Sequence, residues 1–423
     1  MTSATSPQAA RAESAAVPAW GHILIFFAAV AIALSRRPAV LLHAQFFAEG
    51  GTVFFADAYN HGLASLLMAT PRAGYLQIFE RLIALLACLF PLAAAPAITH
   101  FISLTVMALP VNLFLSSRYR FVGSVPVRAV AALVYLALPS TGEVFANVAT
   151  IKAYMPILAL LVIFAIPDRR TGWRIFDIAV LALFSVTGPT VVLLFPAIAL
   201  LWWLRRQRWV MAALAPGAVA QGIVIITTMH KMRTHVTAPL GATPSLLLEI
   251  LSRQVFLAPV LGVKTMPPTT GSGYLAFSVL TTLLGVATII NCALRAALEL
   301  KLFLLCAAVL TTASLVFPLC STTVPQWQVM VMPGACNRYW LIPMLAFLTS
   351  VAWMAWTQRS WQRGAAVIVL LIMLIGIRRD WRHGSYPDQH FARQARFFDQ
   401  VPRGTVMSFA IEPPGWKMRL VKK

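Results

Sequence analysis

The residues best suited to chemistry lie between Gln45 and Arg81, in the segment QFFAEGGTVFFADAYNHGLASLLMATPRAGYLQIFER. Glu49 and Asp57 are close together in this segment, and phenylalanines flank both of them. A carboxylate beside apolar surface is costly unless it is paired, bound to a metal or used in catalysis. The segment therefore predicts a site in which Glu49 and Asp57 act as catalytic base or hold a divalent metal such as Mg or Mn.

Basic and polar residues elsewhere in the chain are the predicted partners of these acids. Transfer of a group from a membrane lipid needs a base for the acceptor hydroxyl and cations for the leaving phosphate. Arg338 begins an apolar run in the motif NRYW, where a guanidinium can reach the lipid phosphates. The other candidates for binding a substrate or its phosphate are Arg72, Tyr75, Glu143, Asn147, Lys152, Lys264 and Tyr339.

Each of these charged residues also has a structural interpretation. Glu49 and Asp57 can cap short loop helices or pair with Arg72, and Glu80 with Arg81 is expected to be a solvated pair at the membrane interface. The alternatives elsewhere are an ion pair of Glu143 with Lys152, an ion pair of Asp177 near Arg174, and Arg338 as a simple anchor of its span.

The composition places the protein in a membrane. Hydrophobic residues make up 59% of its 423 residues, charged residues make up 11%, and the mean hydropathy is +0.78. Soluble domains carry about 25% charged residues, so this chain cannot cover a water-facing surface. Its apolar runs are long and continuous, as in AAVIVLLIMLIGI, which is typical of helices rather than of alternating barrel strands. The predicted fold is an all-α, polytopic transmembrane helical bundle.

The predicted bundle has about eleven spans of the length that a bilayer requires. We place them at 20–34, 97–116, 129–141, 153–167, 174–187, 189–204, 209–228, 274–294, 300–319, 338–356 and 361–377.

The chain divides into three predicted parts: a disordered N-terminal tail at 1–18, a transmembrane domain at 19–377, and a C-terminal extramembrane segment at 378–423. The transmembrane domain has a first outer loop at 36–96, with an interfacial helix at 73–90. Its long outer loop at 229–273 carries the amphipathic sequence PSLLLEILSRQVFLAPVLG. In the C-terminal segment we expect a helix around 389–401 and a strand in TVMSFAI.

Basic residues assign the two sides of the membrane. The net charge of +21 accompanies no RNA- or DNA-binding motif, so it indicates anchoring at the cytoplasmic face and contact with membrane lipids rather than nucleic acid. Arginine clusters such as Arg169 and Arg170 flank the short loops that we place inside, and the loop of Glu49 then lies outside. Eleven spans put the C-terminal segment outside as well, although Arg378 and Arg379 favour the inner side.

The cysteines show no metal-binding spacing, which leaves structural roles for them. Cys320 and Cys336 bracket one predicted outer loop and can form a disulfide if that side is oxidising. The other cysteines fall in apolar runs and are expected to pack in the core.

Several short motifs resemble the GT-C superfamily of membrane glycosyltransferases. AEGGTVFFADAYNHG and PRAGYLQIFERL resemble a bacterial family whose loop tends to read EDG, then F, a small residue and G, then PYAGYLH and R. EVFAN, NRYWLIP and EPPGW resemble later landmarks of that family, so the likeness extends from about residue 45 to residue 416. The chain departs from the pattern at Gly50, where the family has Asp, and at Arg72, where it tends to have Tyr.

This resemblance implies an inverting glycosyltransferase of the bacterial inner membrane whose site faces the periplasm. Such enzymes take a sugar from a polyprenyl-phosphate donor and pass it to a glycan or lipid acceptor of the cell envelope. Glu49 takes the place of the family's first-loop acid, Asp57 is the second acid there, and basic residues such as Arg338 would meet the lipid phosphate. Gly50 weakens the case for a metal held by paired carboxylates.

Two other classes of function fit the same sequence. A transporter or lipid flippase would use membrane-embedded ionisable residues as a path, but the middles of the predicted spans carry almost none. A noncatalytic subunit of envelope polysaccharide assembly would retain the fold without the chemistry.

Overall fold

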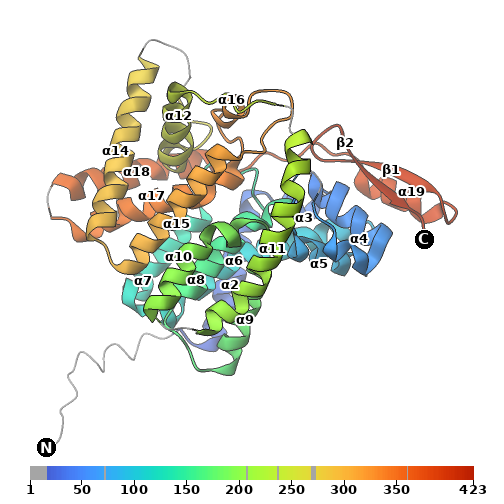
Figure 1. Cartoon of the computed structure of the whole chain (residues 1–423), viewed down its shortest axis with the longest axis horizontal. Helices are drawn as coiled ribbons and strands as arrows, with labels where there is room; N and C mark the ends of the chain where they lie inside the picture. The colour runs from blue at the N-terminus through green and yellow to red at the C-terminus, as the bar shows by residue number, and fades with distance from the viewer. Residues whose placement is uncertain (1–16, 71–72, 206–207, 236–237, 268–272, 360) are drawn as a thin grey trace, which may run out of the picture.

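The computed structural model describes residues 17–70, 73–205, 208–235, 238–267, 273–359 and 361–423, and it is a helical bundle with one small sheet (Figure 1). Helices make up 70% of it. The helices of the first half are α2 (Ala19–Arg36), α3 (Ala39–Leu42), η1 (Gly50–Phe55), α4 (Ala56–His61), η2 (Gly62–Leu67), α5 (Ile78–Ala87), α6 (Ala95–Leu115), η3 (Ser117–Val122), α7 (Val125–Leu136), η4 (Val148–Ala153), α8 (Met155–Phe164), α9 (Thr171–Ser185) and α10 (Thr190–Arg205).

The second half continues with further helices and ends in the sheet. Its elements are α11 (Arg208–His235), α12 (Pro244–Ile250), η5 (Leu251–Leu257), α13 (Ala258–Leu261), α14 (Tyr274–Arg295), α15 (Leu298–Val316), α16 (Gln326–Met330), α17 (Asn337–Thr357), α18 (Trp361–Asp380), α19 (Phe391–Gln400), β1 (Val406–Ile411) and β2 (Trp416–Val421).

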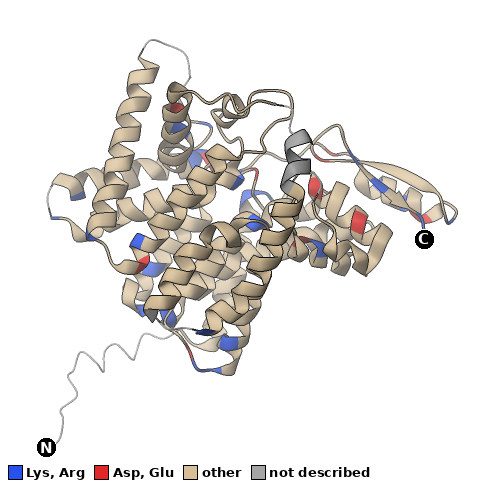
Figure 2. Ribbon diagram, viewed as in Figure 1, with Lys and Arg blue, Asp and Glu red and all other residues tan. Residues whose placement is uncertain are grey.

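Eight helical segments of the described chain are long and apolar enough to cross a membrane, so the protein is a multi-pass membrane protein. Charged residues are sparse along the long helices of the bundle, as lipid contact requires (Figure 2). Seven of the eight match predicted spans: Ala19–Arg36, Ala95–Leu115, Arg208–Thr228, Tyr274–Arg295, Leu298–Val316, Asn337–Thr357 and Trp361–Asp380. The eighth, Pro244–Leu261, falls where an amphipathic interfacial helix was predicted.

The other four predicted spans are helices too short for that criterion, namely α7, α8, α9 and α10. A span perpendicular to the bilayer needs about 20 residues. Prolines set the limits of α8, because Pro156 stands in its first turn and Pro167 follows soon after its last residue, Phe164. Apolar sequence alone does not show where such breaks fall.

Two helices form the centre of the bundle. In α6 and α17, 61% of the apolar span is buried inside the protein, far more than in the outer helices. α17 packs against α14, α15, α18 and η4, while α6 packs against α2, α5, α7 and α8. Trp340 in the first turn of α17 is fully buried, so the start of this helix is fixed in the interior.

Helix α5 turns its polar face inward, which overturns the prediction that Glu80 and Arg81 form a solvated interfacial pair. Both side chains are fully buried, whereas Leu82 and Leu86 on the same helix are 40% and 45% exposed. In a membrane the outer surface meets hydrocarbon, so polar groups find partners only inside the protein. The helix lies where it was expected, but its polar side faces the other way.

The C-terminal segment forms the predicted helix and strand, here α19 and β1, and a second strand, β2, pairs antiparallel with β1. Helix α19 packs on the hairpin through Phe391 and Phe398, whose ring centroids lie 5.9 and 5.2 Å from that of Phe409. In Figure 1 this unit lies at one side of the bundle beside α3, α4 and α5.

The C-terminal segment lies on the same side of the membrane as the first loop, because the two are in direct contact. The backbone N–H of Glu412 donates to Phe46 O at 3.0 Å, and Asn60 bonds to the backbone of β2. An even number of crossings must therefore separate them. Seven of the eight candidate spans lie between the two segments, so either one of these does not cross or a shorter helix crosses too.

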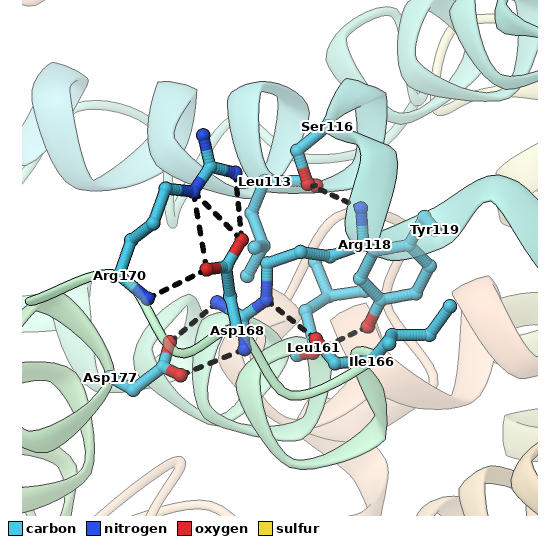
Figure 3. A network of polar contacts seen from close by, with 9 residues as sticks. All are labelled: Leu113, Ser116, Arg118, Tyr119, Leu161, Ile166, Asp168, Arg170 and Asp177. Atoms are coloured by element: carbon cyan, nitrogen blue, oxygen red, sulfur yellow. Dashed lines mark hydrogen bonds and ion pairs between the residues drawn. The ribbon is translucent and has the colours of Figure 1, made fainter. Parts of the chain in front are cut away.

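A buried ion pair joins α9 to η3, the short helix directly after α6 (Figure 3). Arg118 donates to both carboxylate oxygens of Asp177, at 2.7 and 2.8 Å, and each side chain is nearly inaccessible. The predicted partner of Asp177 was Arg174, which is wrong. The real partner is distant in sequence, so local spacing gave no indication of it.

We expect Asp177→Asn to destabilise the protein by about 3–5 kcal/mol, because it leaves a buried guanidinium without a counter-charge. The matched control is Asp168→Asn. That carboxylate pairs with Arg170, whose side chain is 69% exposed, so the loss should stay below about 1 kcal/mol. Unfolding in detergent measures both variants, and equal losses would contradict the expectation.

Candidate functional site

An apolar cavity of about 510 Å³ lies where α10, α11, α15 and α17 meet the segments 73–75 and 317–319. Much of its wall is aliphatic or aromatic, including Val192, Leu193, Leu310 and Ile342. Its size is that of a small-molecule pocket. Four predicted site residues line this same cavity: Tyr75, Lys152, Arg338 and Tyr339. Two cations in an apolar wall suit an amphiphile with an anionic head.

Lys152 and Tyr75 form one part of the wall. The Lys152 ammonium donates to the Tyr75 hydroxyl at 3.1 Å. Burial alone would lower the pKa of Lys152, but the nearby Tyr75 and Glu80 outweigh it and leave that pKa above its ordinary value. Lys152 therefore stays positively charged at neutral pH. Asn147 caps the start of η4, the helix that carries Lys152, since the Asn147 side-chain oxygen accepts from Ala149 N at 2.8 Å.

The segment that carries Tyr75 is held by two residues of α11 that the sequence analysis did not select. Gln221, fully buried in α11, accepts from Leu76 N at 3.0 Å and donates to Leu76 O at 2.8 Å. Thr228 on the same helix donates to Gly74 O at 2.6 Å. A glutamine inside a long apolar run is the one available signal, since an amide in a membrane span needs a partner.

Arg338 forms the other charged part of the wall. Its guanidinium makes an ion pair with Glu143 and donates to Leu319 O at 2.5 Å. The next residue, Tyr339, accepts a hydrogen bond from Leu319 N at 2.9 Å. The ion pair expected between Glu143 and Lys152 is therefore wrong.

Cys320 and Cys336, which the sequence allowed to pair, form a disulfide. It joins the loop after α15 to the start of α17, directly beside Leu319 and Arg338. This covalent link, together with the two bonds at Leu319, keeps the loop that lines the cavity next to the arginine. The cavity wall is thus preorganised on this side.

Glu49 is an exposed carboxylate directly before η1, and it makes no hydrogen bond or ion pair within the described part of the chain. It is not among the residues that line the cavity. Burial lowers the pKa of Lys152, and the Glu49 carboxylate is one of the groups, after Tyr75 and Glu80, that raise it. A free, solvated carboxylate near a cation can accept a proton from an incoming hydroxyl.

Asp57 has a structural partner instead. Its carboxylate accepts from the Arg81 guanidinium at 2.7 Å, and the Arg81 side chain is fully buried while that of Asp57 is 22% exposed. This pair fixes α4 against α5. Arg72, the partner considered from the sequence, lies outside the described residues. Of the two predicted catalytic acids, only Glu49 is free to act as a base.

The residues present do not fit a metal held by Glu49 and Asp57. Asp57 is committed to Arg81, and no group of three potential ligands from His, Cys, Asp and Glu gathers anywhere in the described residues. We derive no step that uses a metal ion.

Two other predicted site residues lie apart from the cavity lining. The Lys264 ammonium donates to the carbonyls of Arg379 and Arg382, at 3.1 and 3.0 Å. It therefore supplies hydrogen bonds to carbonyl groups at the C-terminal end of α18. Asn147 starts η4 and also donates to Glu143 O at 3.4 Å, so it supports the loop that carries the partner of Arg338.

Glu80 is a fully buried acid close to this site. It accepts from Gln77 at 2.9 Å, and its second carboxylate oxygen has no hydrogen-bond partner among the described residues. Burial raises its pKa from 4.5 to about 7. The folded protein therefore keeps a proton on Glu80 at pH values where the unfolded chain has lost it.

We expect the stability of the protein to fall as pH rises from about 4.5 to about 7, since the unfolded state binds fewer protons than the folded state over that interval. Glu80→Gln should remove this dependence. The variant should equal the wild type near pH 4 and exceed it in unfolding midpoint near pH 8, by thermal unfolding in detergent. Parallel pH profiles for the two proteins would contradict this.

The geometry thus gives an apolar cavity with two fixed cations, two phenols and a free carboxylate nearby. Such an arrangement can bind a lipid-linked anion, stabilise a phosphate that leaves, and remove a proton from a nucleophile. No protein-family model matches the chain, and no curated protein matches it either.

Proposed function

We propose that this multi-pass membrane protein is a glycosyltransferase that moves a sugar from a polyprenyl-phosphate donor to a glycan or lipid acceptor. One observation carries the proposal: Lys152 and Arg338 lie in the wall of a largely apolar cavity of about 510 Å³. A donor of this class combines a single phosphate with a long hydrocarbon chain, so it needs both kinds of surface in one place. The motif resemblance supports the same assignment.

The chemistry is a single displacement at the anomeric carbon. The acceptor oxygen forms the new bond to that carbon, and the bond from carbon to the phosphate oxygen breaks. The electron pair leaves with the polyprenyl phosphate, whose charge Lys152 and Arg338 stabilise. Glu49 takes the proton of the acceptor hydroxyl. One displacement inverts the configuration of the sugar.

The topology that fits this function has eleven crossings, with the first loop and the C-terminal segment both outside. The four shorter helices α7 to α10 cross, and Pro244–Leu261 does not. With this assignment, an even number of crossings separates the first loop from the C-terminal segment, as their direct contact requires. The disulfide between Cys320 and Cys336 beside the cavity favours an oxidising compartment, which for a bacterial inner membrane is the periplasm.

The test uses the purified protein in liposomes with polyprenyl-phosphate glucose, mannose and arabinose, each labelled in the sugar, and with envelope lipid as acceptor. The expected result is transfer of label from one donor to the acceptor, with release of polyprenyl phosphate. A fluorescent polyprenyl phosphate in the same liposomes reports movement between leaflets. Movement without any transfer would favour a flippase and would overturn the proposed enzyme.

A further inference from the structure

We propose that the C-terminal segment, through its residues 383–423, is a positioning element that holds Glu49 in place for catalysis. The catalytic part of this inference rests on the proposed function. The docking of the segment on the first loop rests only on the contacts described below. Glu49 has no hydrogen bond or ion pair of its own within the described residues, so its position is set by the backbone on either side of it. That backbone is held by the end of the chain.

Backbone hydrogen bonds join the two segments directly before Glu49. Glu412 N donates to Phe46 O at 3.0 Å, and Ala48 N donates to Glu412 O at 2.5 Å, so that Phe47 and Glu412 form a parallel bridge. Ala48 adopts a left-handed conformation with φ of 45°. This conformation is unfavourable for alanine and persists only where the surroundings impose it, which is a recurring feature of functional sites.

The packing directly after Glu49 is equally close. A Cβ atom at Gly51 would lie 2.7 Å from Ile411 Cδ1 and 2.8 Å from Phe46 Cβ, so even a methyl group there would displace these two neighbours. Ile411 is fully buried. The chain is therefore held against the hairpin both one residue before Glu49 and two residues after it.

Side chains extend this contact on both flanks. The Phe46 and Phe391 rings meet edge to face with centroids 5.3 Å apart. Gln45 donates to Pro387 O at 2.7 Å and accepts from Gln389 N at 3.0 Å. Gln389 also donates to the carboxylate of Glu412 at 2.7 Å, which satisfies a buried acid at the bridge itself.

The donor-binding cations stand on other elements, Lys152 on η4 and Arg338 on α17. Loosening the C-terminal segment should therefore misplace the base without disturbing donor binding. This predicts a fall in kcat with an unchanged KM for the donor. Distortion of the donor site would change both constants. A smaller folded fraction would lower only the apparent kcat, so kcat is expressed per folded protein, and the split then distinguishes a positioning role from a merely structural one.

The experiment compares the full-length wild type with Ile411→Ala, the conservative variant Ile411→Val and Gln389→Ala. Hydrogen exchange of the peptide 45–52 reports the docking, and sugar transfer from the polyprenyl-phosphate probes gives kcat and KM. The matched control is Val406→Ala, because Val406 lies on the same strand but is 47% exposed. Gln389→Ala gives an independent answer if Ile411→Ala does not fold.

We expect Ile411→Ala and Gln389→Ala to speed exchange of the 45–52 amides by about tenfold or more and to lower kcat by about 10–100-fold. The donor KM should stay within about twofold, and Ile411→Val should recover most of the wild-type rate. Val406→Ala should match the wild type in every measurement.

Faster exchange with an unchanged kcat would overturn the positioning role and leave the proposed function standing. Unchanged exchange in both variants would overturn the docking. If the wild type transfers no sugar while exchange behaves as expected, the proposed function fails, and the catalytic role of the segment fails with it.

Discussion

Glu49→Gln is expected to lower the rate of sugar transfer by about 10²–10⁴-fold, the usual contribution of a general base. The amide keeps the size of the side chain and loses only the capacity to accept the proton. Glu49 is exposed and makes no hydrogen bond or ion pair in the described structure, so the substitution should leave the unfolding midpoint unchanged. Transfer assays in liposomes and thermal unfolding in detergent measure the two quantities.

Asp57→Asn is the matched control for this variant, since both acids lie in the first loop. The Asp57 carboxylate neutralises a fully buried arginine, so its loss should lower stability, by about 3–5 kcal/mol at most. Any folded Asp57→Asn protein should retain most of its activity. If Glu49→Gln is active while Asp57→Asn is folded but inactive, then Asp57 is the catalytic base and Glu49 is not.

Arg338→Gln has the second largest expected effect. It removes a cation from the cavity wall, and loss of one such charge at a leaving phosphate should reduce kcat/KM by about 10²–10³-fold. It also leaves the carboxylate of Glu143 without its partner. The single variant should therefore lose both stability and activity, which by itself does not separate the two causes.

The double variant Arg338→Gln with Glu143→Gln separates them. The unpaired acid is now neutral, so the unfolding midpoint should return toward that of the wild type. Activity should stay low, because the phosphate still lacks its cation. If the double variant recovers transfer as well as stability, Arg338 serves the fold alone and the assigned role in catalysis is wrong.

Glu143 and Asp57 illustrate how a site residue differs from a supporting residue in this protein. Each acid is held by an arginine, Arg338 and Arg81 respectively, and each lies close to an apolar interior. Pairing offsets the free-energy cost of holding a charge close to the low-dielectric interior of the protein. The pair at Arg338 still faces a cavity, whereas the pair at Arg81 joins two helices. In the proposed function, the cavity rather than the acid marks the position that binds substrate.

Local features of the sequence determined a large part of the fold. Long apolar runs in a chain with few charges require helices that cross a bilayer, and seven predicted spans have counterparts of sufficient length. The helix α19 and the strand β1 also follow from local pattern. The lengths of α7 to α10 did not follow from hydropathy, because proline and glycine breaks shorten those helices within equally apolar sequence.

The sequence also indicated which residues gather at the site, but not how they pair. Tyr75, Lys152, Arg338 and Tyr339 were selected by residue type beside the ends of predicted spans, and they line one cavity. Their supports were not visible, since Gln221 acts on a segment far away in sequence. Periodicity and composition describe a helix face, not the neighbour that it meets.

By itself, the sequence determined that this protein crosses a membrane several times and that its cations stand at the ends of the spans. Tertiary structure alone decided that Asp57 is neutralised by Arg81, that Glu143 belongs to Arg338, and that the end of the chain docks on the first loop. The physical reason is the distance along the chain over which each interaction acts. Burial of apolar surface acts residue by residue, whereas a hydrogen bond or ion pair between distant segments exists only once the whole bundle has brought them together.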